Sequence, residues 1–333
     1  MDTLRIGLLG CGRIGRVHAD SVTLHPRAEL ARVFDPYEAA ATEVAATVGT
    51  EWTTDAAALI DDPSIGAVIV ASPTPTHVGL LTAAVRAGKA VLCEKPIDLD
   101  LTRVDACRAE IGELTDRVMV GFNRRFDPSF ADIRNRVAAG EIGDLEQLVI
   151  ISRDPAPPPA AYIASSGGLF RDMTIHDFDM ARFFLGDVQA VTATASNLVS
   201  PQIAEAGDID GAVVVLHGSS GALCSITNSR RCAFGYDQRL EAFGALGMLT
   251  AANQLPTSVR FSGARHTEVA PPYANFFLDR YTPAYRAELD HFVTSVENGT
   301  VPSPGFDDGR AALVLADAAN ESLRTGSTVL VSP

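Results

Sequence analysis

The stretch LRIGLLGCGRIG, at residues 4–15, decides the fold of this chain. Its apolar run Leu4–Leu9 predicts a buried strand, and a helical pattern follows from Ile14 to about Leu24. The same rhythm continues along the first third of the sequence, where short apolar runs alternate with helical patterns. These further runs are Glu29–Phe34, Ala67–Ala71, Ala90–Cys93 and Val118–Val120. Such alternation predicts an α/β fold with a parallel sheet that is covered by helices on both faces.

Between the first strand and its helix stands the pattern Gly10-x-Gly12-x-x-Gly15. The first glycine permits a tight turn, the second lets the backbone approach a pyrophosphate, and the third lets the helix pack closely on the strand. The first turn of the helix, with Arg13 and Ile14, then offers free N–H groups and a positive dipole end to phosphate. The pattern therefore predicts a Rossmann domain that binds a dinucleotide.

Asp35 follows the second predicted strand, 20 residues after Gly15 (35 − 15). An acid here accepts hydrogen bonds from the adenosine ribose hydroxyls and repels a 2′-phosphate, so the cofactor is expected to be NAD rather than NADP. A second contact region is expected at the end of the strand Ala67–Ala71. There Ser72 and Thr74 can hydrogen-bond a ribose or pyrophosphate, and His77 either caps the loop or touches the cofactor.

The segment Glu94-Lys95-Pro96 ends another predicted strand and is also expected at the carboxyl edge of the sheet, where ligands bind in such folds. We assign Glu94 and Lys95 to the cofactor site. The Lys95 ammonium could also hydrogen-bond a substrate hydroxyl and stabilise developing alkoxide charge. The alternative is a surface lysine that pairs with Glu94.

Asp172 and His176 are four residues apart in GGLFRDMTIHDFDMARFF. If the helix expected at Ile175–Leu185 includes Asp172, the two side chains share a face, and a carboxylate beside an imidazole favours a general base. A metal site of Asp172, His176 and Asp179 is a weaker alternative, and no metal is expected. A buried histidine satisfied by a neighbouring acid is the structural alternative.

After about Asn123 the pattern changes, which predicts two domains with a boundary near residue 122: an NAD-binding domain at 1–122 and a substrate-binding and oligomerisation domain at 123–333. Helices are expected at Phe130–Ala139, Tyr281–Glu297 and Asp307–Arg324. Strands are expected at Leu145–Ser152, Val188–Ala195, Ala212–Leu216, Ala222–Asn228, Gln238–Phe243 and Met248–Thr250. Because no helix is expected between the last five strands, they predict an open, mostly antiparallel sheet.

Composition narrows the class of protein. The 333 residues carry a formal charge of −14, which disfavours nucleic acid as a partner, although a local basic spot at Arg124-Arg125 remains open. The five cysteines are odd in number and lack a C-x-x-C pair, which favours free thiols in a reducing, cytoplasmic compartment. No apolar stretch approaches the roughly 20 residues of a membrane span, so no membrane is expected.

Several segments together resemble the glucose–fructose oxidoreductase/inositol dehydrogenase family over nearly the whole chain: LRIGLLGCGRIGRVHA, CEKP, GFNRRFDPSF, SRDPAPPP, GGLFRDMTIHDFDMARFFLG and FFLDRYTPAYRAEL. The resemblance implies a Rossmann domain followed by a C-terminal domain with a large open sheet. It also implies NAD-dependent oxidation of a cyclic polyol hydroxyl to a ketone, with myo-inositol the leading substrate, in a homo-oligomer that is a dimer or a tetramer.

In that family the residues matching Lys95, Asp172 and His176 form the catalytic triad. The resemblance implies that His176 removes the hydroxyl proton, that Asp172 orients His176 and that Lys95 positions the hydroxyl. It places Asn123, Arg124, Asp154 and Tyr281 near the nicotinamide or the polyol: Arg124 on the cofactor side, the other three on the substrate side. Two residues depart from the pattern: Thr74 replaces a common asparagine, and Ser152 replaces a histidine found in some inositol dehydrogenases.

Two other functions stay open at this point. One is a dehydrogenase for another cyclitol, such as scyllo-inositol, or for a pyranose or anhydrosugar. The other is a non-catalytic NAD-binding regulator, which the intact Lys95, Asp172 and His176 disfavour.

Overall fold

Six parallel strands form the first sheet, in the order β3-β2-β1-β4-β5-β6. Their bounds are β1 (Leu4–Leu9), β2 (Ala28–Phe34), β3 (Glu51–Thr53), β4 (Ala67–Val70), β5 (Ala90–Glu94) and β6 (Val118–Gly121). The computed structural model describes residues 3–331. The strand order reverses direction between β1 and β4, and ligands of such sheets bind outside the carboxyl ends of the strands at this switch point. The predicted parallel Rossmann sheet is confirmed.

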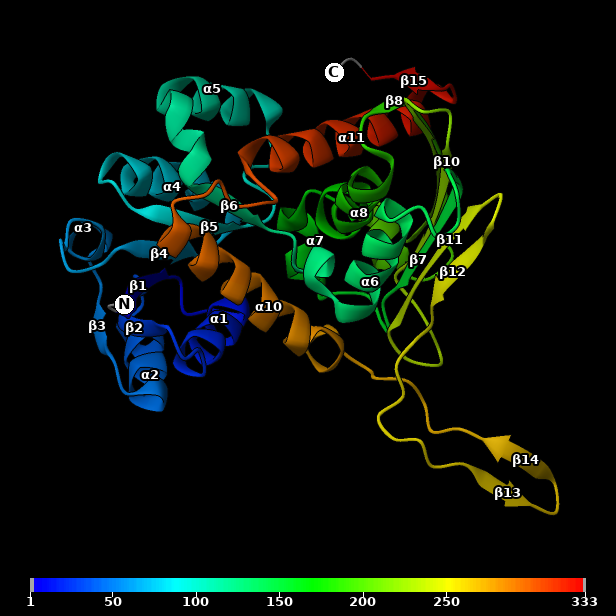
Figure 1. The fold of residues 1–333 in the computed structure, drawn as a ribbon, viewed down its shortest axis with the longest axis horizontal. Helices are drawn as coiled ribbons and strands as arrows, with labels where there is room; N and C mark the ends of the chain where they lie inside the picture. Colours follow the sequence, from blue (N-terminus) through cyan, green and yellow to red (C-terminus); the bar gives the residue numbers. More distant parts are fainter. Residues whose placement is uncertain (1–2, 332–333) are drawn as a thin grey trace. The chain divides into compact units, whose positions relative to one another are not determined.

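The helices of this sheet are α1 (Arg13–Thr23), α2 (Glu38–Val48), α3 (Ala56–Ile60), α4 (His77–Arg86) and α5 (Leu101–Ile111), with 3-10 turns η1 (Thr74–Thr76), η2 (Gly112–Arg117) and η3 (Asn123–Phe126) (Figure 1). The sequence did not predict β3 or α3. Both are short, and α3 depends on one cap, in which the Asp55 carboxylate accepts a hydrogen bond from the Ala57 N–H at 2.9 Å.

The second sheet has seven strands in the order β12-β11-β7-β10-β9-β8-β15. Their bounds are β7 (Leu145–Arg153), β8 (Val188–Ser196), β9 (Gly211–Gly218), β10 (Leu223–Ser229), β11 (Asp237–Gly244), β12 (Gly247–Ala251) and β15 (Val329–Leu330). Neighbouring strands are antiparallel except β7 and β10, which are parallel. The expectation of a mostly antiparallel sheet is therefore confirmed.

Four helical segments precede β8 in the second part of the chain: α6 (Pro128–Ala138), α7 (Ala160–Ser166), a π-helical turn η4 (Phe170–Thr174) and α8 (Ile175–Leu185). The expectation that no helix separates the later strands was wrong, because α9 (Pro201–Glu205) lies between β8 and β9. The loop before α9 is held by Asp210, whose carboxylate accepts hydrogen bonds from the N–H groups of Leu198, Val199 and Ser200. A hairpin of β13 (Phe261–Gly263) and β14 (His266–Val269) projects beyond β12 (Figure 1).

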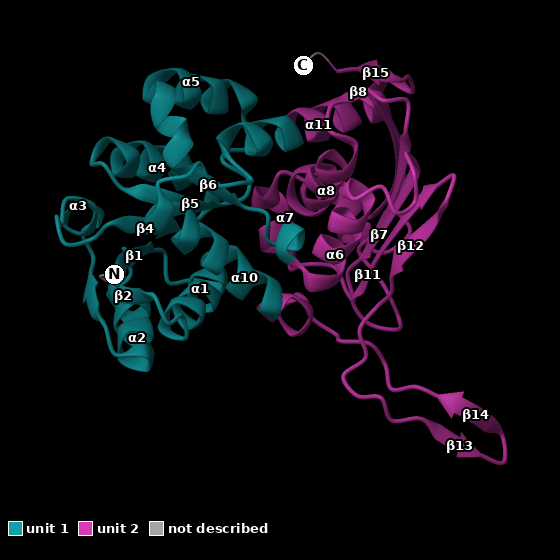
Figure 2. Ribbon diagram, viewed as in Figure 1, with its two compact units in different colours: residues 1–126, 283–313 teal, residues 127–282, 314–333 magenta. Residues whose placement is uncertain are grey.

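The chain divides into two compact units that are not contiguous in sequence (Figure 2). Unit 1 comprises residues up to 126 and 283–313, and unit 2 comprises 127–282 and the residues from 314 on. The helices α10 (Phe277–Asn298) and α11 (Phe306–Thr325) each contribute to both units. In unit 1, Leu289, Phe292 and Val293 of α10 share one apolar core with the first sheet. The predicted division near residue 122, into an NAD-binding domain and a substrate-binding and oligomerisation domain, stays a prediction.

Candidate functional site

The glycine turn after β1 has the backbone that its sequence demands. Gly10 has φ +109°, and a Cβ there would lie 2.7 Å from the main chain of Ala71. A Cβ on Gly15 would lie 2.0 Å from the Gly10 carbonyl oxygen, whereas one on Gly12 would meet nothing within 4 Å. The turn is therefore closed on the protein side at Gly10 and Gly15 and open at Gly12, as close approach by a ligand requires.

The N-terminus of α1 is free to receive an anion. Gly12 caps the helix without a side-chain hydrogen bond, and the first turn holds no acidic residue. Beside it, the Asp35 carboxylate accepts hydrogen bonds from the Cys11 N–H and the Tyr37 N–H, both at 2.9 Å. These residues fit a dinucleotide, with its pyrophosphate at the start of α1 and its adenosine ribose against Asp35.

Residues 72–77 follow β4, beside the glycine turn. The Ser72 hydroxyl hydrogen-bonds the Thr76 hydroxyl at 2.6 Å, and Thr74 begins the turn η1. The buried His77 ring lies between two carbonyl oxygens, that of Pro96 at 2.8 Å from Nδ1 and that of Ser72 at 2.7 Å from Nε2. His77 thus links the loops after β4 and β5. A contact of Ser72, Thr74 or His77 with the cofactor stays a prediction.

Glu94 ends β5 in a buried environment. Its Oε1 lies 2.7 Å from Nε2 of His18 on α1, and its Oε2 accepts a hydrogen bond from the Lys95 main-chain N–H at 3.3 Å. The His18 side chain is fully buried and packs edge-on to the ring of Tyr285, with ring centroids 5.7 Å apart. No sequence motif predicts this His18–Glu94 pair, whose members are 76 positions apart. The His18–Glu94 pair therefore helps to hold the main chain at Lys95 in place.

Asn123 and Arg124 lie in η3, just after β6, and both are buried, as is Arg125. One guanidinium nitrogen of Arg125, Nη2, donates a hydrogen bond to Asp308 at 3.1 Å. Because both arginines are buried, they form no basic surface spot of the kind that the sequence left open. Lys95, Asn123 and Arg124 all follow carboxyl ends of neighbouring parallel strands, β5 and β6.

In unit 2, Asp172 and His176 lie on one continuous helical segment, as the prediction that they share a helix face requires. Asp172 lies in the π-helical turn η4, which continues directly into α8 at Ile175, so Asp172 and His176 are about one turn apart on a continuous helical segment. Asp172 Oδ1 accepts a hydrogen bond from the Tyr162 hydroxyl at 2.8 Å. Its Oδ2 accepts one from Arg230 Nη1 at 3.0 Å, so both carboxylate oxygens are fixed.

The sequence analysis missed Arg230. Its side chain is only 3% exposed, and its Nη1 also lies 3.5 Å from Asp154 Oδ2. Asp154 follows β7 and Arg230 follows β10, and because these neighbours are parallel, their carboxyl ends meet at one edge of the sheet. The Asp154 N–H continues the ladder by donating to the Ser229 carbonyl at 2.9 Å. We call Asp154, Asp172 and Arg230 the unit 2 polar cluster.

A second buried polar group lies under the same sheet. Tyr281 is 1% exposed, and its hydroxyl donates a hydrogen bond to Gln238 Oε1 at 3.2 Å. The amide nitrogen of Gln238 donates to the Ser152 hydroxyl at 2.9 Å. Ser152 thus connects through Gln238 to the predicted substrate residue Tyr281.

All five cysteines are free and buried. Burial, with a smaller contribution from the Asp35 carboxylate, raises the pKa of Cys11 to about 12. Burial also raises the pKa of Cys93, Cys107, Cys224 and Cys232 above the ordinary thiol range. The thiols therefore stay protonated near neutral pH and serve packing rather than nucleophilic chemistry.

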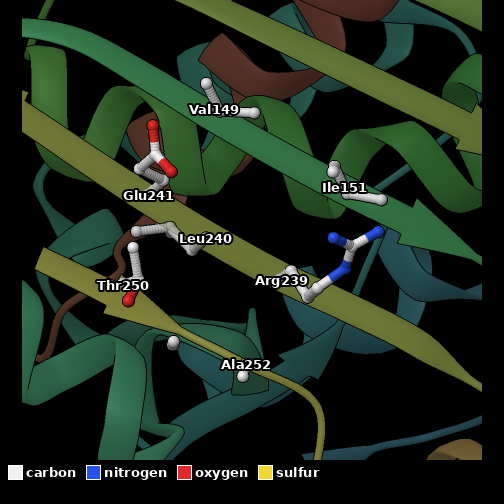
Figure 3. Close-up of a pocket in the computed structure, with 8 residues that line it drawn as sticks. Val149, Ile151, Arg239, Leu240, Glu241, Thr250 and Ala252 are labelled. Atoms are coloured by element: carbon white, nitrogen blue, oxygen red, sulfur yellow. The ribbon is translucent and has the colours of Figure 1, made fainter.

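A hollow of about 160 Å³ opens between β7, β11 and β12. Its lining includes Val149, Ile151, Glu241 and Thr250, as Figure 3 shows, and none of the predicted site residues. The neighbouring Arg239 donates a hydrogen bond to Asp237 at 2.7 Å. The hollow is thus lined by strand side chains and contains no group of residues suited to catalysis.

Among residues 3–331, no three His, Cys, Asp or Glu side chains group as metal ligands. None of the helices in that range is long and apolar enough to cross a bilayer.

Two family models match this chain. Residues 4–122 match the oxidoreductase family with an NAD-binding Rossmann fold, and residues 130–250 match the GFO/IDH/MocA C-terminal domain. The chain belongs to the GFO/IDH/MocA oxidoreductase family. An inositol 2-dehydrogenase of Rhizobium meliloti (strain 1021) is 48% identical over 327 residues, which are 96% of this chain and 97% of that protein.

Solved structures of the GFO/IDH/MocA family agree with this fold. A myo-inositol dehydrogenase from Corynebacterium glutamicum ATCC 13032 is 54% identical, with a TM-score of 0.98 over 99% of both chains. A scyllo-inositol dehydrogenase from Lactobacillus casei, with bound NAD(H) and scyllo-inositol, is 28% identical, with a TM-score of 0.89 over 99% of both chains. Residues 4–122 are therefore the NAD-binding Rossmann part of an oxidoreductase, as the glycine pattern after β1 predicted.

Proposed function

We propose that the chain is an inositol 2-dehydrogenase that oxidises myo-inositol to 2-keto-myo-inositol with NAD. The observation that carries this proposal is the helical Asp172–His176 pair, with both oxygens of Asp172 fixed by Tyr162 and Arg230. The relatives named as inositol and myo-inositol dehydrogenases, at 48% and 54% identity over nearly the whole chain, support the choice of substrate.

In the proposed reaction, His176 takes the proton of the ring hydroxyl while the carbon that bears it gives up a hydride. Bound NAD supplies the hydride acceptor. Asp172 stabilises the positive charge that develops on the His176 imidazole, and Lys95 hydrogen-bonds the hydroxyl oxygen and favours its alkoxide form. The products are a ketone, NADH and one proton. Because a proton is released, a higher pH should shift the equilibrium of the reaction toward the ketone.

A cofactor role is proposed for Gly10, Gly12, Arg13, Ile14 and Gly15. The same role is proposed for Asp35, for the loop residues Ser72, Thr74 and His77, and for Glu94, Lys95 and Arg124. A substrate role is proposed for Asn123, Asp154 and Tyr281. Tyr281 is buried and its hydroxyl donates a hydrogen bond to Gln238. Both observations support a role in which Tyr281 shapes the substrate site by packing.

A spectrophotometric screen of cyclitols and sugars, with NAD and with NADP, tests the function. NADH should appear with myo-inositol and NAD. Activity confined to scyllo-inositol would favour the second candidate, which the structure of a relative with bound scyllo-inositol supports. NAD binding without turnover of any polyol would leave a regulatory protein and refute the proposal.

Single and double variants at Lys95 and His176 test the catalytic assignment. Lys95→Ala and His176→Ala should each lower kcat by about 100- to 10,000-fold while NAD still binds. If both act on the same hydroxyl, the double variant should lose much less than the product of the two single losses. A single variant with wild-type turnover would remove that residue from the mechanism.

We also propose a cytoplasmic homo-oligomer, a dimer or tetramer, without nucleic acid or membrane partners. The five buried, protonated thiols suit a reducing compartment. The exposed side chains of Val213, Leu223 and Phe243, on strands of the second sheet, support self-association through this sheet. Sedimentation analysis should give a mass of two or four chains, and a monomer at micromolar concentration would refute the assembly.

A further inference from the structure

Arg230 has hydrogen-bonding capacity that the protein leaves unused. Its Nη1 contacts Asp172 and Asp154, but its Nε and Nη2 are buried without a hydrogen-bond partner anywhere in residues 3–331. Buried N–H donors are normally satisfied, and a guanidinium nitrogen left without an acceptor is costly. Arg280 also has an unpartnered Nε and Nη2, but of the two only Arg230 forms ion pairs with predicted site residues, Asp154 and Asp172. An acceptor from outside the protein can therefore satisfy the Arg230 donors.

The two unused nitrogens form one edge of the guanidinium plane, which presents two roughly parallel N–H donors. In three other arginines of this chain, Nε and Nη2 each donate a hydrogen bond to one of the two oxygens of a carboxylate. These pairs are Arg108 with Asp307, Arg310 with Asp105 and Arg324 with Glu321. The Arg230 edge is therefore shaped for a ligand with two neighbouring oxygen atoms.

Charge decides between the two ligand classes with that geometry, a carboxylate and a vicinal diol. Arg230 carries one positive charge and faces two carboxylates, Asp154 and Asp172, so the acids that flank its guanidinium outnumber it by one charge when both are ionised (+1 − 2). An anionic ligand at that edge would lie close to these two carboxylates, and such an approach of like charges is unfavourable. A neutral diol accepts from the Arg230 edge and can donate its own O–H groups to the carboxylates.

We infer that Arg230 is a specificity-determining residue that binds two adjacent hydroxyl oxygens of the substrate through Nε and Nη2, while its Nη1 holds Asp172, about one helical turn from His176. The inference rests on the proposed function and goes further, because it assigns recognition of a neutral vicinal diol to a residue that the sequence motifs do not mark. Substrates with a carboxylate or phosphate in place of that diol should be rejected.

A cycle between protein variants and substrate analogues tests this role. The variants are Arg230→Gln and Arg230→Lys, and the analogues are monodeoxy-inositols that each lack one hydroxyl other than the oxidised one. With myo-inositol, R230Q should lower kcat/KM by about 10- to 150-fold, the value of hydrogen bonds from a charged donor. With the analogue that lacks a bound hydroxyl, wild type should already be slow, and R230Q should lose little more.

Two controls separate recognition from folding. Arg171→Gln removes an arginine of the same unit whose Nε and Nη2 edge is occupied by Asp317, at 2.9 and 2.6 Å, and it should change kcat/KM by less than about 3-fold. R230K keeps a charge for Asp172 but has no two-pronged edge, so it should fold and show the same pattern as R230Q. NAD binding and the melting temperature report folding of each variant.

The outcomes are distinct. Equal losses on every analogue in both Arg230 variants would mean that Arg230 acts only on the protein, or that its edge binds water, and would overturn the inference. If wild type turned over no cyclitol, the proposed function would fail. Calorimetric titration of the NADH complex with myo-inositol would then decide the inference, because binding equal in wild type and R230K would also overturn it.

Discussion

Replacing His18 with alanine removes the side chain that holds the Glu94 carboxylate, one residue before Lys95. The His18 side chain is fully buried, so the change leaves a cavity, and large-to-small substitutions in a core cost about 2–5 kcal/mol. It also deprives a nearly buried carboxylate of a 2.7 Å hydrogen bond, which costs about 1–3 kcal/mol. Since neighbouring effects overlap rather than add, we expect the free energy of unfolding to fall by about 3–5 kcal/mol.

The same substitution should also lower kcat. Glu94 Oε2 accepts the Lys95 main-chain N–H, so release of Glu94 lets the main chain at Lys95 move. A misplacement of about 1 Å at a reacting group can reduce turnover by about 100-fold, and we expect kcat to fall by about 10- to 100-fold with little change in NAD affinity. Urea denaturation measures the stability, and steady-state kinetics with the polyol measures the turnover.

Two further variants make this test specific. His18→Gln keeps an N–H donor for Glu94 and should recover part of both losses. His266→Ala removes an exposed histidine of β14, so it should cost about 1 kcal/mol or less and leave kcat unchanged. If H18A unfolded and turned over like wild type, or if H266A lost as much as H18A, the assigned support of Lys95 by this pair would be refuted.

Four other substitutions each change a single carboxylate. Asp35→Ser should lower kcat/KM with NAD by about 10- to 100-fold and raise it with NADP, because the ribose loses a charged acceptor and the repulsion of a 2′-phosphate disappears; unchanged discrimination in cofactor kinetics would place the adenosine site elsewhere. Asp127→Ala should cost about 3–5 kcal/mol in urea denaturation, since it strands the buried Arg280, whereas Asp100→Ala removes only an exposed helix cap, worth about 1 kcal/mol; equal losses would contradict this reasoning. Burial acts to raise the pKa of Asp237, but hydrogen bonds from an arginine and an asparagine outweigh it and hold that pKa below its usual range. Its stabilisation is therefore present above about pH 4 and lost as pH falls through the depressed folded value, so Asp237→Asn should flatten the acid side of the stability curve.

The features that the sequence predicted best are those that the backbone demands locally. Gly10, Gly12 and Gly15 are required by a positive φ, an open approach and a close contact, and each requirement can be read from the spacing alone. The first sheet was predicted for a similar reason, since its apolar runs are largely buried and are bounded by glycine, proline or aspartate. Short elements with little apolar content, such as β3 and α9, carry no such pattern and were missed.

The residues that the sequence could not reveal are those whose partners are distant in the chain. His18 precedes Glu94 by 76 positions, and Arg230 follows Asp172 by 58. A histidine inside a helix, or an arginine after a strand, is in most proteins a packing or surface residue, so residue type alone gives no reason to choose it. Only the pairing of strands and helices shows that these side chains are buried against carboxylates.

The parallel pairing of β7 with β10 explains why unit 2 has a polar cluster at all. In an antiparallel pair, the carboxyl ends of neighbouring strands lie at opposite edges of the sheet, so residues that follow the two strands are separated by the strand length. A sheet that was antiparallel throughout would therefore hold Asp154 and Arg230 apart. The observed register, with Arg153 beside Ser229, instead makes them adjacent, and the turn that carries Asp172 meets them there. The recognition site in unit 2 thus depends on one exception to the sheet's antiparallel order, and a motif search confined to contiguous sequence cannot find it.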